Sequence, residues 1–285
     1  MSDSPEGAAP ARGRLFLISV GVGDPDNITL RAHKTLAQTD VVFCMSRVRN
    51  RFADLLAGKP VHEAGHGLFT PLARRDASDA EVDAMEGQTR QTIRKALAEG
   101  KTVAILDYGD PCLYGPQAGY LHEFRDLDPV VIPGVSSFNA ANAALATNIA
   151  DGAHSRSVLL TVARNADAAY RGDDRLDKLA ETRSTMVIFT MGIDLPRVVE
   201  QLSRHYPANT DVALVCHAGE IERQSVQRAT LATVLELVGK NPPPFEHLLY
   251  IGDFASTTRD VGTPQGQKIC LSDTTRASTL GSATR

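Results

Sequence analysis

The stretch TVAILDYGDPCLYG, residues 102–115, joins the pattern of a buried strand to the residues of a tight loop. Its apolar run, Val103–Leu106, fits a buried strand of a parallel sheet. The loop follows Asp107, because glycine allows close backbone approach and proline ends a strand ladder. A helix is expected over Pro116–Arg125, since proline is tolerated in a first helical turn. A strand, a Gly/Pro loop and a helix in this order predict a ligand site at the carboxyl edge of an open α/β sheet.

An ordinary turn between a strand and a helix would explain this stretch if it stood alone. Three similar loops follow other apolar runs, at Gly21–Pro25, Pro133–Ser137 and Met191–Gly192. A further glycine, Gly219, ends another apolar run. Loops that follow the strands of an α/β sheet form its ligand sites, so the repetition favours a binding site over an ordinary turn.

The composition indicates a folded protein and disfavours two classes of partner. Hydrophobic residues make up 42% of the 285 residues and charged residues 22%. The net charge of -4 offers nucleic acid no basic face. No apolar stretch approaches the roughly 20 residues that a membrane-spanning helix needs. The N-terminus lacks the apolar core of a signal peptide, so we expect a cytoplasmic protein with four reduced cysteines: Cys44, Cys112, Cys216 and Cys270.

Strands and helices alternate along the chain in two units, which predicts an α/β fold with mostly parallel sheets. The units are expected over residues 14–133 and 134–255, after a disordered leader (1–13) and before a mobile tail (256–285). The first unit contains five expected strands: Arg14–Val20, Asp40–Cys44, Pro60–Glu63, Val103–Leu106 and Pro129–Ile132. The second contains four strands and an antiparallel edge strand: Val158–Ala163, Met186–Thr190, Val212–Cys216, His247–Gly252 and the edge strand Glu222–Gln227.

The clearest helix is expected over Asp79–Glu99. Ser78 and Glu81 have the spacing of a capping box, which satisfies backbone N–H groups at a helix start. One face of this helix is apolar and is expected to pack on the sheet: Val82, Met85, Ile93 and Leu97. A shorter helix is expected over Arg49–Ala57.

Two familiar kinds of site do not fit the sequence. A nicotinamide dinucleotide fold would need a third glycine in GVGDPD, and a phosphate loop would need a GK[ST] motif.

A zinc site is suggested by His62 and His66, which lie four apart in HEAGH. Glycine and proline around this segment prevent a helix from placing both rings on one face, so we expect no metal. We interpret His66 as a solvated loop residue or one that touches substrate.

The loops taken together resemble those of the tetrapyrrole (corrin/porphyrin) methylases, which use S-adenosylmethionine. The family's first loop reads VGxGPGDPxxIT, and here it is SVGVGDPDNIT, with Ser19 in place of a glycine and Val22 in place of a proline. The family's GDPxxYG is intact over Gly109–Gly115, and its PGVSSFxAAxAAL is matched over Pro133–Leu145. The pattern VALVCHAGEIERQSVQRATL resembles the family's second half, and the resemblance extends from about Arg14 to Ala255.

Within the family, PGVSSF and STMVIFTMG…YPANTDVALV most resemble the precorrin-4 C11-methyltransferases of cobalamin synthesis. The segment CMSRVRNRFADLLAGKPVHEAGHGLFT departs from that subgroup's usual pattern. The resemblance implies two α/β domains, S-adenosylmethionine in the cleft between them, a tetrapyrrole substrate and a homodimer. It also implies direct methyl transfer to a ring carbon, in which the protein aligns the reactants and excludes water.

The resemblance also implies roles for particular residues. The cofactor is expected to touch residues of the four glycine loops and the further glycine: Val22, Tyr108, Gly109, Asp110, Leu113, Ser136, Ser137, Met191 and Gly219. Arg47, Arg49 and Arg51 are expected to pair with the acidic side arms of the substrate, because guanidinium suits carboxylate. A solvated helix start is the alternative for these arginines. Asp110 and His66 are the candidates for a general base.

Two other functions remain open at this point. Related proteins with the same fold methylate other substrates: other tetrapyrroles, peptides or RNA. A binding module that senses S-adenosylmethionine without chemistry is the third reading. An open cleft beside the cofactor would favour an enzyme, and a closed one would favour the sensor.

Overall fold

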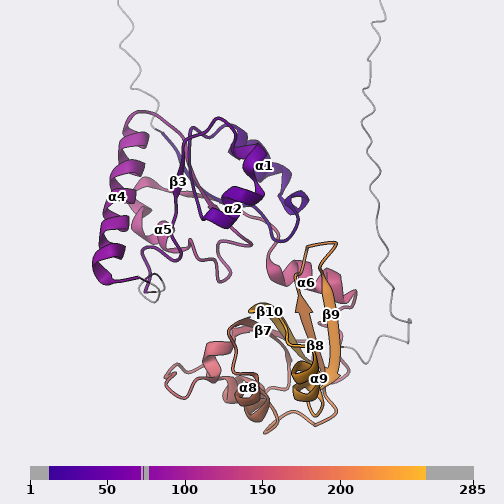
Figure 1. The fold of residues 1–285 in the computed structure, drawn as a ribbon. Coiled ribbons are helices and arrows are strands. Elements are labelled where there is room, and N and C mark those ends of the chain that lie inside the picture. Colours follow the sequence, from indigo (N-terminus) through magenta and orange to yellow (C-terminus); the bar gives the residue numbers. More distant parts are fainter. Residues whose placement is uncertain (1–12, 72, 74–76, 255–285) are drawn as a thin grey trace, which may run out of the picture.

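A computed structural model describes residues 13–71, 73 and 77–254, and two five-stranded sheets form its framework (Figure 1). The expected leader and tail lie outside these residues, apart from Gly13, which donates to the carbonyl of Leu97. The first sheet has the order β3-β2-β4-β1-β5, and all of its strand pairs are parallel. Its strands are β1 (Leu15–Ser19), β2 (Val41–Cys44), β3 (Val61–Glu63), β4 (Val103–Asp107) and β5 (Val130–Ile132).

Helices cover both faces of the first sheet, as its uninterrupted apolar strands require. Helices α1 (Leu30–Ala37), α2 (Ser46–Arg51) and α3 (Ala53–Leu56) cover one face. Helices α4 (Asp79–Ala98) and α5 (Gly119–Glu123) cover the other. Successive residues of β1 alternate between the two apolar clusters, so both clusters depend on the same strands.

Helix α4 begins with the capping box that the sequence predicts. Ser78 and Glu81 exchange both expected hydrogen bonds. The predicted apolar face is wrong at Met85, which is 37% exposed, and Glu86 is buried one position later. Burial of this carboxylate is tolerated because it accepts a hydrogen bond from the Phe69 N–H at 2.8 Å and pairs with Arg90 at 3.3 Å.

The second sheet has the order β6-β7-β10-β8-β9. Its strands are β6 (Val158–Val162), β7 (Thr185–Met191), β8 (Asp211–Cys216), β9 (Ser225–Thr230) and β10 (Glu246–Gly252). One face packs against helices α7 (Leu176–Ala180), α8 (Leu195–Leu202) and α9 (Val234–Lys240). The other face packs against helix α6 (Ser137–Leu145), whose Ala141 and Leu145 contact the same cluster as Val187 and Tyr250.

The expected α/β class is confirmed, and five of the eight strand pairs in the described part of the chain are parallel. The three antiparallel pairs all lie in the second sheet, where β10 pairs with β7 and β8, and β8 pairs with β9. The edge strand is antiparallel as predicted. It starts at Ser225 rather than Glu222, because hydrogen bonds from Glu220 to His217 and from Gln224 to Glu220 close a turn first.

Two expected helices are shorter than the sequence suggests. The helix expected over Arg49–Ala57 is divided into α2 and α3 at Phe52, whose φ of -111° and ψ of 27° are not helical. The helix expected over Pro116–Arg125 is reduced to α5, followed by a 3-10 turn over Arg125–Leu127. No helix within the described ranges combines the length and apolarity needed to cross a membrane. The three described cysteines are free thiols: Cys44, Cys112 and Cys216.

Candidate active site

The loops after β1 and β4 are joined, because these strands are parallel neighbours and end at the same edge. The Gly109 N–H donates to the Gly21 carbonyl at 3.0 Å. The Ser19 hydroxyl donates to the Gly109 carbonyl and accepts from the Gly21 N–H at 3.2 Å. Ser19, which departs from the family pattern, therefore links the loop after β1 to the loop after β4 through hydrogen bonds.

Gly109 lies close to two other predicted cofactor residues, Val22 and Ser136. Its φ of +89° lies in the region that glycine adopts far more readily than other residues. A Cβ added at this position would lie 3.5 Å from Val22 Cγ1 and 4.0 Å from Ser136 Cα, with no closer atom. Val22, Gly109 and Ser136 come from three separate loops that the fold brings together, and their contact with the cofactor stays a prediction.

Ser136 begins α6 and uses its hydroxyl for that purpose. The hydroxyl donates to Asn139 Oδ1 at 2.7 Å and accepts from the Asn139 N–H at 3.2 Å. The Asn139 Oδ1 also accepts from the Ser136 N–H at 3.1 Å, which completes a capping box. The next residue, Ser137, is the first residue of the helix and is partly exposed.

Gly219 lies beside Val22 from the opposite sheet. Its carbonyl accepts from the Asp24 N–H at 2.8 Å and from the Asn27 side chain at 3.0 Å. A Cβ at Gly219 would lie 3.0 Å from the Val22 carbonyl. A Cβ at Gly23 would overlap the Gly219 carbonyl carbon, so the two glycines permit a direct contact between main chains.

The predicted arginines have different surroundings. Arg51 donates to the Gly23 carbonyl and the Tyr108 hydroxyl, and its guanidinium lies 3.5 Å from Glu220. Arg47 lies 4.8 Å from the centre of the Tyr108 ring and pairs with Glu246 at 3.3 Å.

Arg49 is exposed on α2, between these two arginines in the sequence. It makes no ion pair within the described residues. Two of the three arginines thus already face a carboxylate of the protein. The solvated helix start considered as the alternative fits Arg49 and also Arg47, whose side chain is 55% exposed.

The loop after β4 also reaches the second sheet. The Tyr114 hydroxyl donates to the Leu160 carbonyl at 3.2 Å, and its ring lies 4.8 Å from that of Phe189. Leu113 is partly exposed in this loop. Met191, at the end of β7, is 50% exposed. Phe245, 68% exposed, lies against the neighbouring Gly192, where a Cβ would come within 2.7 Å of its ring.

The two candidates for a general base lie in different settings. The Asp110 carboxylate accepts from the Cys112 N–H at 2.8 Å, which stabilises the turn within the loop. His66 is exposed in the loop after β3. No cluster of three or more potential metal ligands occurs in the part of the chain that the structure describes. Both catalytic assignments stay predictions.

The sequence reasoning missed Asp107, the last residue of β4. Its side chain is fully buried, and burial raises its pKa to about 7 despite two backbone hydrogen bonds. One oxygen accepts from Gln117 at 3.1 Å and the other from Tyr108 at 2.8 Å. Asp107 therefore closes the base of the loop. An acidic residue at the end of an otherwise apolar strand was the available signal.

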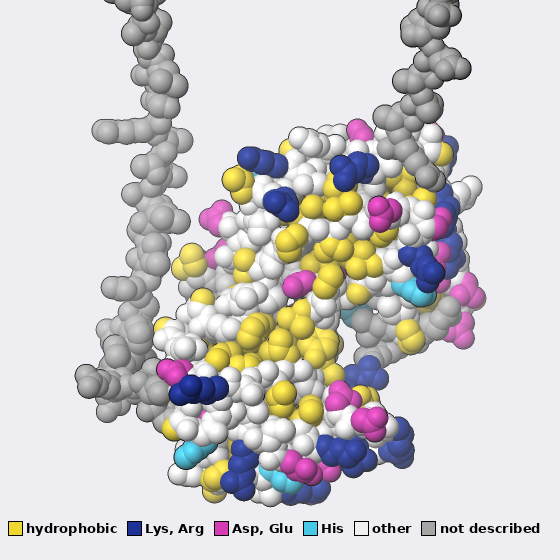
Figure 2. Space-filling view, turned by 180° about the vertical axis from the view of Figure 1, so that it is seen from behind, with side chains coloured by type: hydrophobic (Ala, Val, Ile, Leu, Met, Phe, Trp, Pro, Cys, Tyr) yellow, Lys and Arg dark blue, Asp and Glu magenta, His cyan; other side chains and the backbone are white. Residues whose placement is uncertain are grey.

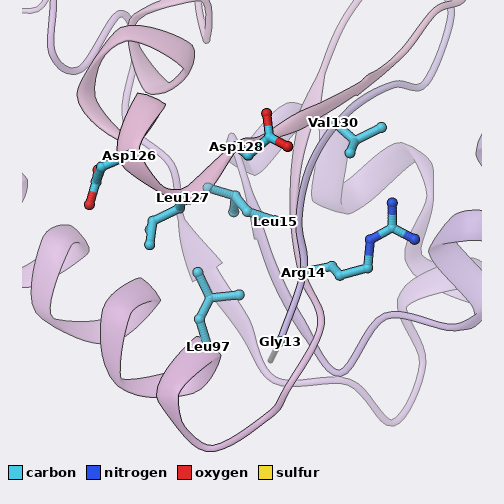
Figure 3. Close-up of a pocket in the computed structure, with 8 residues that line it drawn as sticks. All are labelled: Gly13, Arg14, Leu15, Leu97, Asp126, Leu127, Asp128 and Val130. Atoms are coloured by element: carbon cyan, nitrogen blue, oxygen red, sulfur yellow. The ribbon is translucent and has the colours of Figure 1, made fainter. Parts of the chain in front are cut away.

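A separate cavity of about 280 Å³ lies at the opposite edge of the first sheet (Figure 3). It lies between the start of β1 and the end of α4 and contains none of the predicted site residues. Its lining is mixed in character: Gly13, Arg14, Leu15, Leu97, Asp126, Leu127, Asp128 and Val130.

Two α/β units whose strand-end loops meet define a class of proteins with a ligand site between open sheets. Residues 14–235 match the family model of the tetrapyrrole (corrin/porphyrin) methylases, which is more than half of the chain. The chain belongs to this family. The resemblance recognised in the sequence, and with it the methyltransferase class of enzyme, is confirmed.

Relatives include two kinds of tetrapyrrole enzyme. The siroheme synthase of Psychrobacter arcticus is 28% identical over 87% of this chain and 44% of its own length. The chain thus spans about half the length of the siroheme synthases it matches. The precorrin-4 C(11)-methyltransferase of Pseudomonas aeruginosa is 29% identical over 84% of this chain and 89% of its own length.

Solved structures show the same fold. A cobalt-precorrin-4 methyltransferase has a TM-score of 0.68 at 24% identity and covers 84% of this chain and 94% of its own. A uroporphyrin-III C-methyltransferase from Thermus thermophilus, complexed with S-adenosylhomocysteine, has a TM-score of 0.63 at 22% identity over 86% of this chain and 100% of its own. At these identities the structural likeness establishes the fold.

Proposed function

We propose that the protein transfers a methyl group from S-adenosylmethionine to a ring carbon of a corrin precursor, precorrin-4 or cobalt-precorrin-4, in cobalamin biosynthesis. The observation that supports a cofactor site most directly is the meeting of Val22, Gly109 and Ser136, where a Cβ on Gly109 would come no closer than 3.5 Å to the other two residues. These residues come from three loops in distant parts of the sequence, and Gly109 contributes no side chain. The family of the chain supports the reaction type.

The choice of substrate rests on the motifs PGVSSF and STMVIFTMG…YPANTDVALV, which most resemble those of the precorrin-4 C11-methyltransferases. Precorrin-4 methyltransferases also match this chain over 87% and 89% of their own length. Coverage alone does not separate the two substrates, because a solved uroporphyrin-III C-methyltransferase aligns over 100% of its own chain. The siroheme synthases nevertheless support a second candidate, methylation of another tetrapyrrole such as uroporphyrinogen III.

The residues at the site fit a cofactor with a polar amino acid part and an apolar methyl-bearing sulfur. Bound S-adenosylmethionine supplies a methyl group on a sulfonium, which is already a good leaving group. Gly109 leaves room for close approach, and Val22 and Met191 offer apolar walls. The capping box of α6 occupies the N–H groups of Ser136 and Asn139. The N–H groups of Ser137 and Phe138, in the first turn between them, suit a carboxylate of the cofactor.

The remaining predicted residues complete the proposal. Tyr108, Asp110, Leu113, Ser137 and Gly219 would contact the cofactor from the same loops. The protein's contribution to rate is alignment of the methyl group with the ring carbon and exclusion of water. Asp110 or His66 would remove the proton from the methylated carbon.

We also propose the assembly and location expected from the family resemblance. The two domains divide between β5 and α6, consistent with the packing of α6 on the second sheet, and the cofactor occupies the cleft between them. The protein is a cytoplasmic homodimer. Apolar side chains gather over the middle of one face, with charged side chains toward its periphery, and such a face suits a second copy (Figure 2). A monomeric mass by light scattering at micromolar concentration would contradict the dimer.

Methyl transfer is tested by mass spectrometry. Purified protein is incubated with S-adenosylmethionine and either precorrin-4 or uroporphyrinogen III, and we expect one added methyl group on precorrin-4. Methylation of uroporphyrinogen III in its place would establish the second candidate. Binding of S-adenosylhomocysteine without methylation of either would favour a sensor. Analysis of the tetrapyrroles that accumulate when the protein is removed from its host gives the natural substrate independently.

A further inference from the structure

The guanidinium of Arg51, on α2, contacts three loops that end at the candidate active site. It donates to the Gly23 carbonyl after β1 and to the Tyr108 hydroxyl after β4, the latter at 3.3 Å. Its third partner is the Glu220 carboxylate after β8, at 3.5 Å. One side chain therefore links two loops of the first sheet to a loop of the second.

This ion pair is more enclosed than the one between Arg47 and Glu246. The side chains of Arg51 and Glu220 are 30% and 15% exposed, compared with 55% and 53% for the other pair. Water weakens exposed ion pairs, whereas a partly buried guanidinium with several acceptors is held in one geometry. Glu220 is held from a second side by Arg223 at 3.1 Å. Arg51 is therefore suited to fixing loops, and its donors are already directed at protein acceptors.

The three contacts coincide with the predicted cofactor loops. Gly23 follows Val22, Glu220 follows Gly219, and Tyr108 is itself a predicted cofactor residue. The Tyr108 hydroxyl also accepts from the Gly23 N–H at 2.7 Å. A shift of the guanidinium would therefore release Tyr108 and the backbone beside Val22 together.

We propose that Arg51 is a positioning residue for the S-adenosylmethionine site. Together with Glu220 it forms a clamp that holds the loops after β1, β4 and β8 in the arrangement that accepts the cofactor. This inference rests on the proposed function and changes one assignment within it. Arg51 acts on the cofactor side, and Arg49 is left to meet an acidic side arm of the substrate.

The test compares Arg51→Met and Arg51→Lys with Arg49→Met as the matched control. The two arginines lie on the same helix and are two positions apart, but Arg49 lacks the contacts to the three loops. Calorimetry measures the Kd for S-adenosylhomocysteine. Absorbance titration measures the Kd for uroporphyrin III, a stable porphyrin with acidic side arms, in the presence of saturating S-adenosylhomocysteine. Circular dichroism and the Tm report folding.

We expect Arg51→Met to raise the Kd for S-adenosylhomocysteine by roughly tenfold or more, because charge-assisted hydrogen bonds at three loops are lost. Arg51→Lys should recover part of this affinity, since its ammonium can still face Glu220 but cannot span all three acceptors. The Kd for the porphyrin should stay at the wild-type value in both variants. Arg49→Met should show the reverse pattern. Adding Glu220→Gln to Arg51→Met should weaken binding less than the separate effects predict.

Three results would overturn the clamp. The first is an unchanged Kd for S-adenosylhomocysteine in Arg51→Met while wild-type protein binds it. The second is a rise in the porphyrin Kd alone, which would return Arg51 to the substrate. The third is a lowered Tm with normal affinity in the folded protein, which would make the contact structural only. Failure of wild-type protein to bind S-adenosylhomocysteine is a different outcome, because it refutes the proposed function itself.

Discussion

Replacement of Gly109 by leucine should abolish binding of S-adenosylmethionine and leave the fold intact. The Cβ of the new side chain would lie 3.5 Å from Val22 Cγ1 and 4.0 Å from Ser136 Cα. Its remaining carbon atoms would extend from there into the space proposed for the cofactor. Because this space lies at the strand-end loops and not within the apolar clusters, the core should keep its packing.

The effect of a substitution at Gly109 has two parts: a conformational cost to the backbone and a loss of cofactor affinity caused by the volume of the side chain. Gly109 has φ +89°, so any residue with a Cβ pays a conformational penalty of roughly 1–3 kcal/mol there. For a protein of this size, each 1 kcal/mol lowers the Tm by about 2–4 °C. The nearest atoms to the added Cβ are at ordinary contact distances, so Gly109→Ala should pay this penalty alone. Leucine should add a loss of affinity of roughly a hundredfold or more, equivalent to about 2.7 kcal/mol.

Calorimetric titration with S-adenosylhomocysteine separates the two parts. The alanine variant should bind with modestly reduced affinity, and the leucine variant should give no heat of binding. Both should show the same decrease in Tm, of about 2–12 °C. Normal affinity in the leucine variant would refute the reasoning, because the loop over residues 108–113 would then be an ordinary turn. Equal loss in both variants would assign the effect to the backbone.

Three further outcomes are expected. Because burial raises the pKa of Asp107 to about 7 from an ordinary 3.8, the folded state favours its protonated form. Its contribution to stability is therefore complete below the ordinary value and lost as the pH rises to about 7. In urea titrations, the unfolding free energy of wild type relative to Asp107→Asn should therefore fall between about pH 4 and pH 7, and a constant difference would contradict the shift. Arg49→Gln should raise the KM for the tetrapyrrole without changing the Kd for S-adenosylhomocysteine, and equal weakening of both would remove Arg49 from the substrate site. Chelators should leave methylation unchanged; loss of activity that zinc restores would mean that His62 and His66 have been misread.

The sequence predicted the elements of the fold better than their directions. Apolar runs and a capping box locate β4 and the start of α4, because these signals are local. The antiparallel position of β10 between β7 and β8 depends on pairing across long separations, which no local pattern reports. The prediction that Met85 is buried was wrong for a related reason: Glu86 is buried in its place, and this depends on the hydrogen bond from the Phe69 N–H.

The candidate site shows the same division. The family resemblance implied that Val22, Gly109 and Ser136 contact the cofactor, and the fold brings these three residues close together. The ion pair between Arg51 and Glu220 was not predictable, because the two residues are separated by 169 positions and meet only after both sheets form. Asp107 was passed over because a buried acid at a strand end becomes meaningful once its two hydrogen bonds are known.

The order of the strands also determines which sheet can form first during synthesis on the ribosome. The first sheet is complete once Ile132 has left the exit tunnel, so this half can fold while the remainder is still being translated. The second sheet cannot close in this way, because its central strand, β10, is the last to be made and ends at Gly252. Until then β7 and β8 each expose an unpaired edge to other nascent chains. Chaperone demand should therefore be concentrated in the final third of translation.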